Sequence, residues 1–289
     1  MIESWRRHAA AGMAIAAMVS LAGCANLADV QDFAKASHAV VASEPIIASW
    51  PGAYATAKRR AGRLDTLTAL CKLPPDDMRS AIRAEMDMAA QDADTAVKTA
   101  AVLALYMDML GKLAGDDLTD TSEQRTALQA SIATVASAPE KAAAGALLAV
   151  LDVAIDGWRR HKIAALVKQA DPSVQVLTHY LARTTKAVAA AEAAGARLGD
   201  AYWERSGCNA DEGTRSLLLE RAAAEDAVAG LLEERAALAA KLYAKIGKDH
   251  AAMAAATGKL SGTEVRAILK RDVPVLNDAL KAFQGSSTS

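Results

Sequence analysis

The chain has 289 residues and a net charge of −1 at pH 7, with 52% hydrophobic but only 4% aromatic residues. A near-neutral chain lacks the positive charge with which proteins bind nucleic-acid phosphates, so no nucleic-acid partner is predicted. Alanine supplies much of the hydrophobic fraction. This composition favours closely packed α-helices over a core of large aromatic rings.

The first 23 residues have the order of a bacterial export signal. Arg6 and Arg7 form a basic head, and residues 9–22 carry no charge. The run is shorter than the roughly 20 apolar residues that a membrane-spanning helix needs. It ends in LAGC at residues 21–24, which resembles the lipobox of bacterial lipoproteins. The resemblance implies diacylglycerol on the thiol of Cys24, cleavage before Cys24 and acylation of the new amino terminus.

The same resemblance implies a location. In the lipoprotein pattern, an aspartate after the cysteine favours retention at the inner membrane, whereas here Ala25 follows. We therefore expect a protein anchored by its Cys24 lipid to the outer membrane and facing the periplasm. Each buried acyl methylene contributes about 0.8 kcal/mol, so two or three chains would hold it there almost permanently.

Helix-start signals, prolines and glycines divide the remaining chain. They predict helices over 28–70, 75–114, 122–136, 139–170, 172–206, 211–257 and 262–284. Pro45 and Pro51 should kink or break the first, and Asp171-Pro172 should begin a new helix. Gly247 and Pro274 are weaker points of interruption.

No segment shows the sustained alternation of apolar and polar residues that is typical of strands. The predicted fold class is all-α: after the signal peptide 1–23, one elongated bundle of long antiparallel helices spans residues 24–284, and residues 285–289 form a disordered tail. Without the signal peptide the net charge would be −2.

Two helices show apolar seams with spacings of three, four or seven residues, which predict the faces that pack in the bundle. In the stretch 97–115, Tyr106, Met107 and Met109 are likewise expected to pack rather than to line a cofactor pocket. The seams consist of Ala224, Val228, Leu231, Leu238, Leu242 and Ile246, and of Val265, Leu269, Leu276, Leu280 and Phe283.

The two other cysteines, Cys71 and Cys208, fall in predicted loops between helices. An even pair in an exported chain suggests a disulfide bond. The alternative is two unpaired thiols, because sequence spacing alone does not establish proximity.

Residues 139–162 combine an apolar run with an aromatic and basic end, formed by Trp158, Arg159, Arg160 and Lys162. Such an end is typical of membrane interfaces, but Asp152 and Asp156 interrupt the run, and each would cost a few kcal/mol at a bilayer centre. We interpret the stretch as a central bundle helix whose end is a candidate interaction surface. Trp50 and Trp203 are further docking candidates.

Motifs that carry chemistry are missing from the sequence. It has no paired Glu-x-x-His, no Cys-x-x-Cys-His, no Gly-x-Ser-x-Gly and no phosphate-binding glycine-rich loop. No catalytic residue, metal ligand or cofactor is therefore predicted, and the protein is not expected to be an enzyme. The leading hypothesis is a lipid-anchored interaction or scaffolding protein that contacts another envelope protein. The alternative is a helical protein that perturbs membranes through residues 139–162.

Overall fold

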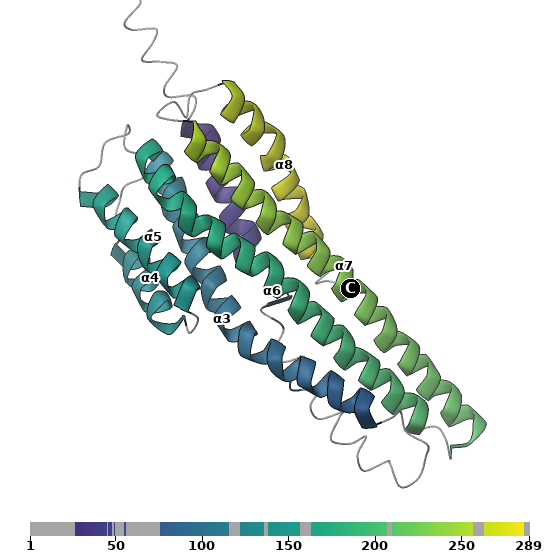
Figure 1. Cartoon of the computed structure of the whole chain (residues 1–289). Coiled ribbons are helices and arrows are strands. Elements are labelled where there is room, and N and C mark those ends of the chain that lie inside the picture. The colour runs from purple at the N-terminus through teal and green to yellow at the C-terminus, as the bar shows by residue number, and fades with distance from the viewer. Residues whose placement is uncertain are drawn as a thin grey trace, which may run out of the picture.

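The computed structural model describes residues 27–44, 46–47, 49, 55, 76–115, 122–135, 138–156, 163–206, 210–256 and 263–285. Within these ranges every regular element is a helix, which confirms the all-α prediction. A helix over residues 27–42, here called the first helix, comes before the helices labelled in Figure 1. These are α3 (Asp76–Ala114), α4 (Ser122–Thr134), α5 (Ala138–Asp156), α6 (Ile163–Ser206), α7 (Glu212–Ala255) and α8 (Thr263–Gly285).

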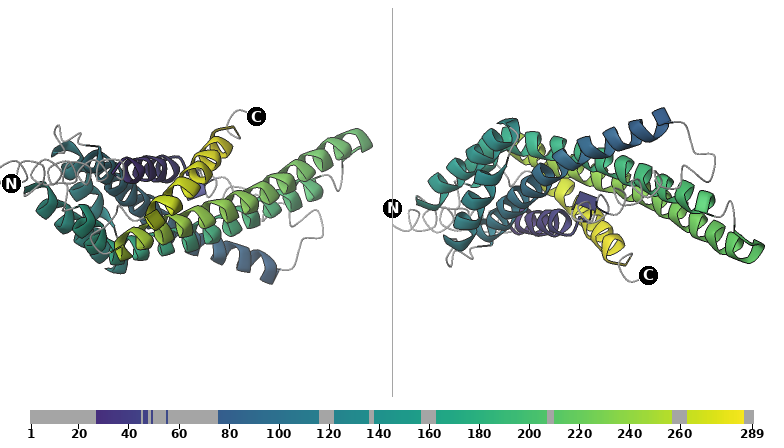
Figure 2. Two further views of the ribbon diagram at one scale, coloured as in Figure 1. Left: turned by 90° about the horizontal axis from the view of Figure 1, so that it is seen from above. Right: turned by 90° about the horizontal axis from the view of Figure 1, so that it is seen from below.

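The long antiparallel pair α6 and α7 gives the molecule its elongated shape (Figure 1). Each helix has 44 residues, which corresponds to a length of about 66 Å. The pair extends well past the first helix and α8 (Figure 2). We call the end with residue 27 and the start of α8 the proximal end, where Arg266 forms a 3.1 Å ion pair with Asp29. The end at which α6 stops and α7 begins is the distal end.

The main hydrophobic core lies in the proximal half of the molecule. There the first helix, α3, α5, α6, α7 and α8 all contribute buried side chains to one cluster. Burial of each large apolar side chain contributes about 1.5–3 kcal/mol. The largest fully buried apolar and aromatic side chains are Tyr106, Tyr243, Phe33, Ile46, Leu103, Met107, Met109, Leu110, Leu113 and Leu147. The expectation that Tyr106, Met107 and Met109 pack inside is thus confirmed.

The seam predicted for α7 is right in its second half and wrong in its first. Leu242 and Ile246 are buried, whereas Val228 and Leu231 are 48% and 52% exposed. The buried residues there include alanines at seven-residue spacing, among them Ala222 and Ala229, and Ala229 clusters with Ala193 and Ala196 of α6. Alanine side chains let two helices approach closely. In this half α7 therefore packs through its alanines, and the larger side chains of Val228 and Leu231 stay exposed.

The helix boundary predicted at Asp171-Pro172 is also wrong. α6 runs without a break through Pro172, and the preceding helix α5 already ends at Asp156. Pro172 removes one backbone N–H and its ring crowds the carbonyl of the preceding turn, which in a helix interior costs about 3 kcal/mol. Val167 and Val174, on either side of this position, are fully buried. Packing of the turns around Pro172 therefore outweighs the local cost of the proline.

The other boundaries agree with the sequence to within a few residues, apart from that of the first helix. This helix ends at residue 42, and Glu44 is not helical, since a residue before a proline avoids the helical conformation. Pro274 and Gly247 interrupt neither α8 nor α7. The last helix includes Gly285, the first residue of the predicted tail, and residues 286–289 lie outside the described residues.

Replacing either of two glycines in α7 by alanine should change stability in opposite directions. A Cβ on Gly247 would lie 2.6 Å from Oγ1 of Thr178, whereas a Cβ on Gly230 would meet nothing within 4 Å. Gly230→Ala should therefore stabilise the protein by about 0.5–1 kcal/mol through helix propensity. Gly247→Ala should destabilise it by about 1–3 kcal/mol because α7 must move away from α6. Urea unfolding measures both, and equal stabilisation by the two changes would contradict the close contact.

Candidate functional site

The sites predicted from sequence fall mostly outside the described residues, so they remain predictions. Trp203 is half-buried on α6 near the distal end, with the guanidinium of Arg221 6.0 Å from its ring centre. Three predicted sites lie outside the described residues: the lipid site Cys24, the candidate disulfide Cys71–Cys208, and the interaction candidates Trp158, Arg159, Arg160 and Lys162. Trp50 lies outside them as well.

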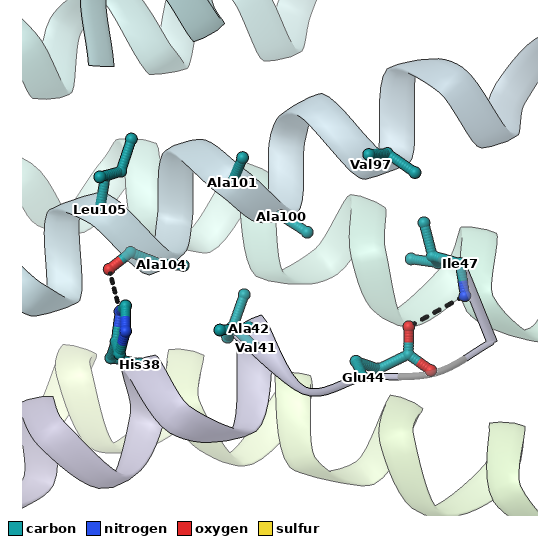
Figure 3. Close-up of a pocket in the computed structure, with 10 residues that line it drawn as sticks. All are labelled: His38, Val41, Ala42, Glu44, Ile47, Val97, Ala100, Ala101, Ala104 and Leu105. Atoms are coloured by element: carbon teal, nitrogen blue, oxygen red, sulfur yellow. Dashed lines mark hydrogen bonds between the residues drawn. The ribbon is translucent and has the colours of Figure 1, made fainter. Parts of the chain in front are cut away.

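An open groove of about 430 Å³ lies between the first helix and α3 (Figure 3). Small side chains at helical spacing on α3 leave this space, among them Ala100, Ala101 and Ala104. The volume is within the range of about 300–1,000 Å³ that is usual for small-ligand sites, and a mostly apolar lining with few polar groups is typical of them. The remaining lining residues are His38, Val41, Ala42, Glu44, Ile47, Val97 and Leu105.

Two polar side chains, His38 and Glu44, line the groove (Figure 3). Nδ1 of His38 lies 2.9 Å from the carbonyl oxygen of Ala104, to which it donates. The carboxylate of Glu44 accepts hydrogen bonds from the backbone N–H groups of Ile46 at 2.9 Å and Ile47 at 3.1 Å. Glu44 therefore caps the turn that follows the first helix and holds its charge at one fixed place.

A second glutamate, Glu192 of α6, lies close enough to Glu44 for the two charges to interact, and each is only 5% exposed. Burial raises the pKa of Glu192 to about 7; a 3.3 Å hydrogen bond from Ser49 opposes this and the charge of Glu44 adds to it. Burial also raises the pKa of Glu44, against the effect of its two backbone donors. Among the described residues, no lysine or arginine forms an ion pair with either glutamate.

Tyr243 of α7 adds a third group to this acidic pair. Its side chain is 1% exposed, and its hydroxyl has no hydrogen-bond partner in the described part of the chain. Burial raises the tyrosine pKa, and the negative charge of Glu44 raises it further. Glu44 therefore lies within electrostatic reach of an unpaired buried hydroxyl.

A separate chain of buried hydrogen bonds joins α3, α7 and α6. The Tyr106 hydroxyl donates to Nε2 of His250 at 2.8 Å, and Nδ1 of His250 donates to Asp171 at 2.9 Å. Burial lowers the pKa of His250 in spite of the aspartate, and the His250 hydrogen bond is the main cause that lowers the pKa of Asp171. A nucleophile must reach its substrate, but Tyr106 and His250 are both 0% exposed. We therefore assign a structural role to this series of hydrogen bonds, because it links three helices.

A carboxyl pair joins α7 to α8. Asp272 accepts from Lys245 at 2.7 Å and from Arg271 at 2.7 and 2.9 Å, and these partners, Arg271 first, lower its pKa. Asp249 is 1% exposed, and among the described residues no donor reaches either of its oxygens. Burial and the neighbouring Asp272 raise the pKa of Asp249. The raised pKa favours a proton on Asp249, next to the charged Asp272.

An exposed apolar surface follows the distal half of α7. Leu217 is 68% exposed, and it lines up with Ala224, Val228 and Leu231 at spacings of seven, four and three residues. We call these four residues the distal α7 strip. Contiguous apolar patches on soluble surfaces frequently mark interaction sites. The sequence pattern included Ala224, Val228 and Leu231 of this strip but assigned them to the core, and it did not single out Leu217.

In the described ranges, no group of three or more His, Cys, Asp or Glu side chains is placed to hold a metal ion. Nor does any helix in these ranges combine the length and the apolar character needed to cross a membrane. No protein-family model, no curated protein and no solved structure matches the chain.

Proposed function

We propose that the protein is a lipid-anchored periplasmic interaction protein of the bacterial outer membrane, which acts through helix-face contacts with another envelope protein. The observation that carries the proposal is the LAGC sequence at residues 21–24 after an uncharged run. The described part of the first helix starts at residue 27, three positions after Cys24 in the sequence. A lipid on Cys24 would therefore hold the proximal end of the bundle at the membrane surface.

The position of the distal α7 strip supports contact as the mode of action. The strip lies on the half of α7 that extends away from the proximal end (Figure 2). Leu217 and Leu231 are more than half exposed there, and exposed large apolar side chains bury well against a complementary partner. The strip is thus the surface that we assign to the envelope partner.

A photoreactive side chain at position 224 tests this assignment in cells. Cross-linking from this position should give one discrete adduct with an envelope protein, because Ala224 lies within the distal α7 strip. The matched control is position 237, also an exposed alanine of α7 but on the other side of the helix. No adduct from position 224, or equal adducts from both positions, would contradict the proposal.

The alternative function, membrane perturbation by residues 139–162, requires α5 to leave the bundle. Ala144 and Leu147 of α5 are 0% exposed, so its departure would expose apolar surface of α5 and of the core beneath it. Dye release from anionic vesicles by the protein without acyl chains would favour this alternative over the interaction protein.

A further inference from the structure

Glu44 and Glu192 form a buried acidic pair. In the described part of the chain, no lysine or arginine pairs with either of them. Taking a carboxylate out of water is costly unless a cation or hydrogen bonds compensate it. Glu44 receives two backbone donors, and Glu192 receives one long hydrogen bond from Ser49. Where both glutamates are ionised, a bound cation would compensate part of their combined charge.

The groove beside Glu44 gives access to this charge. Glu44 lines it together with apolar side chains such as Val41, Ala101 and Leu105 (Figure 3). Val97, at its edge, is 41% exposed, so the groove is open to solvent. An apolar channel that leads to a fixed carboxylate suits a ligand with an apolar body and one positive end.

The buried hydroxyl of Tyr243 is a further polar group that feels the charge of Glu44, although Tyr243 does not line the groove. A phenol in the core normally pairs with an acceptor or a water molecule, and this one has no partner among the described residues. It is 1% exposed and feels the charge of Glu44. Glu192 on α6 and Tyr243 on α7 both interact electrostatically with Glu44, so they contribute to the field behind the groove.

We propose that the groove between the first helix and α3 binds a small organic ammonium, an amine with a short apolar chain, whose charged end pairs with Glu44 in the field of Glu192. An anion is disfavoured by both glutamates, and a neutral ligand would leave their charges uncompensated. The apolar chain lies along the alanines of α3, where it displaces water.

The proposal predicts that binding strengthens as the pH rises. The titratable groups that face Glu44 are Glu192 from α6, Tyr243 from α7 and His38 from the first helix, whereas α3 lines the groove without a charged side chain. Protonation of either glutamate removes charge that attracts the ammonium. Binding is therefore weaker in acid.

Calorimetric titration of the full-length protein with hexylammonium chloride tests the proposal. We expect binding at about pH 8 that is at least tenfold weaker at about pH 5.5. Hexanol has the same chain without the charge and should bind at least about tenfold more weakly at pH 8, and hexanoate should bind more weakly still. No binding of hexylammonium up to about 10 mM, equal binding of hexanol, or no pH dependence would overturn the proposal.

Two variants locate the site. Glu192→Gln keeps the acceptor for Ser49 and should weaken hexylammonium binding about tenfold. Ala101→Leu fills the groove and should abolish binding, whereas Ala84→Leu, at an exposed position of the distal half of α3, should leave it unchanged. Wild-type affinity in Ala101→Leu, or in Glu192→Gln, would show that the amine binds elsewhere and would refute the site.

Discussion

His250→Ala is expected to lower the free energy of unfolding by about 3–5 kcal/mol. The imidazole is 0% exposed, and its removal leaves a cavity among α3, α6 and α7. It also leaves the Tyr106 hydroxyl without its acceptor and takes a hydrogen bond from Asp171. An unpaired buried polar group costs about 1–3 kcal/mol beyond the cavity.

Urea unfolding of His250→Ala beside His179→Ala measures this effect. His179 is an exposed histidine on α6, so its replacement should change stability by less than about 0.5 kcal/mol. Tyr106→Phe keeps the packing but removes one hydrogen bond, so its free energy of unfolding should lie between those of the two histidine variants. If His250→Ala were no less stable than His179→Ala, the buried hydrogen-bond chain would not contribute to the fold.

Asp249→Asn is expected to stabilise the protein by about 2 kcal/mol at about pH 8 and to have little effect near pH 4. Asp249 is buried against Asp272, with Lys245 and Arg271 as the nearest cations, and its pKa is raised by burial and by Asp272. The folded state thus holds this proton more tightly than the unfolded chain does. Wild-type stability from this group is complete in acid and falls as the pH rises towards the raised pKa.

Asparagine at position 249 keeps an N–H donor for Asp272 and carries no charge at any pH, so the difference from wild type should appear on the alkaline side. Thermal or urea unfolding at the two pH values measures it. The control is Asp278→Asn on the exposed side of α8, where Asp278 pairs with Lys281 at 3.1 Å. It should change the free energy of unfolding by less than about 0.5 kcal/mol at both pH values. Destabilisation by Asp249→Asn at pH 8 would contradict the raised pKa.

Local signals were sufficient for most helix boundaries. Asp211 caps α7 by accepting from the backbone N–H of Thr214 at 2.9 Å, and it is the residue at which the predicted helix 211–257 begins. The predicted starts of α3 and α8 lie one residue from the observed ones. Caps and prolines act over three or four residues, so the sequence alone reveals them.

Contacts between distant residues decided what the sequence did not predict. Asp171 before a proline has the pattern of a cap, but its carboxylate instead pairs with His250, 79 positions away. The face of α7 that packs on α6 depends on how closely alanines of both helices approach. The acidic pair brings together Glu44 and Glu192, which are 148 positions apart in the chain. No periodic pattern marks such contacts, since they depend on tertiary packing.

The mass of the mature protein, extracted from bacterial envelopes, tests the central claim most directly. We predict a chain that begins at Cys24 and carries a diacylglyceryl group on its thiol and an acyl group on its amino terminus. Cys24→Ser should instead give the uncleaved precursor without lipid. A wild-type chain cleaved at another residue, or one with an unmodified Cys24, would contradict the lipid anchor and with it the proposed function.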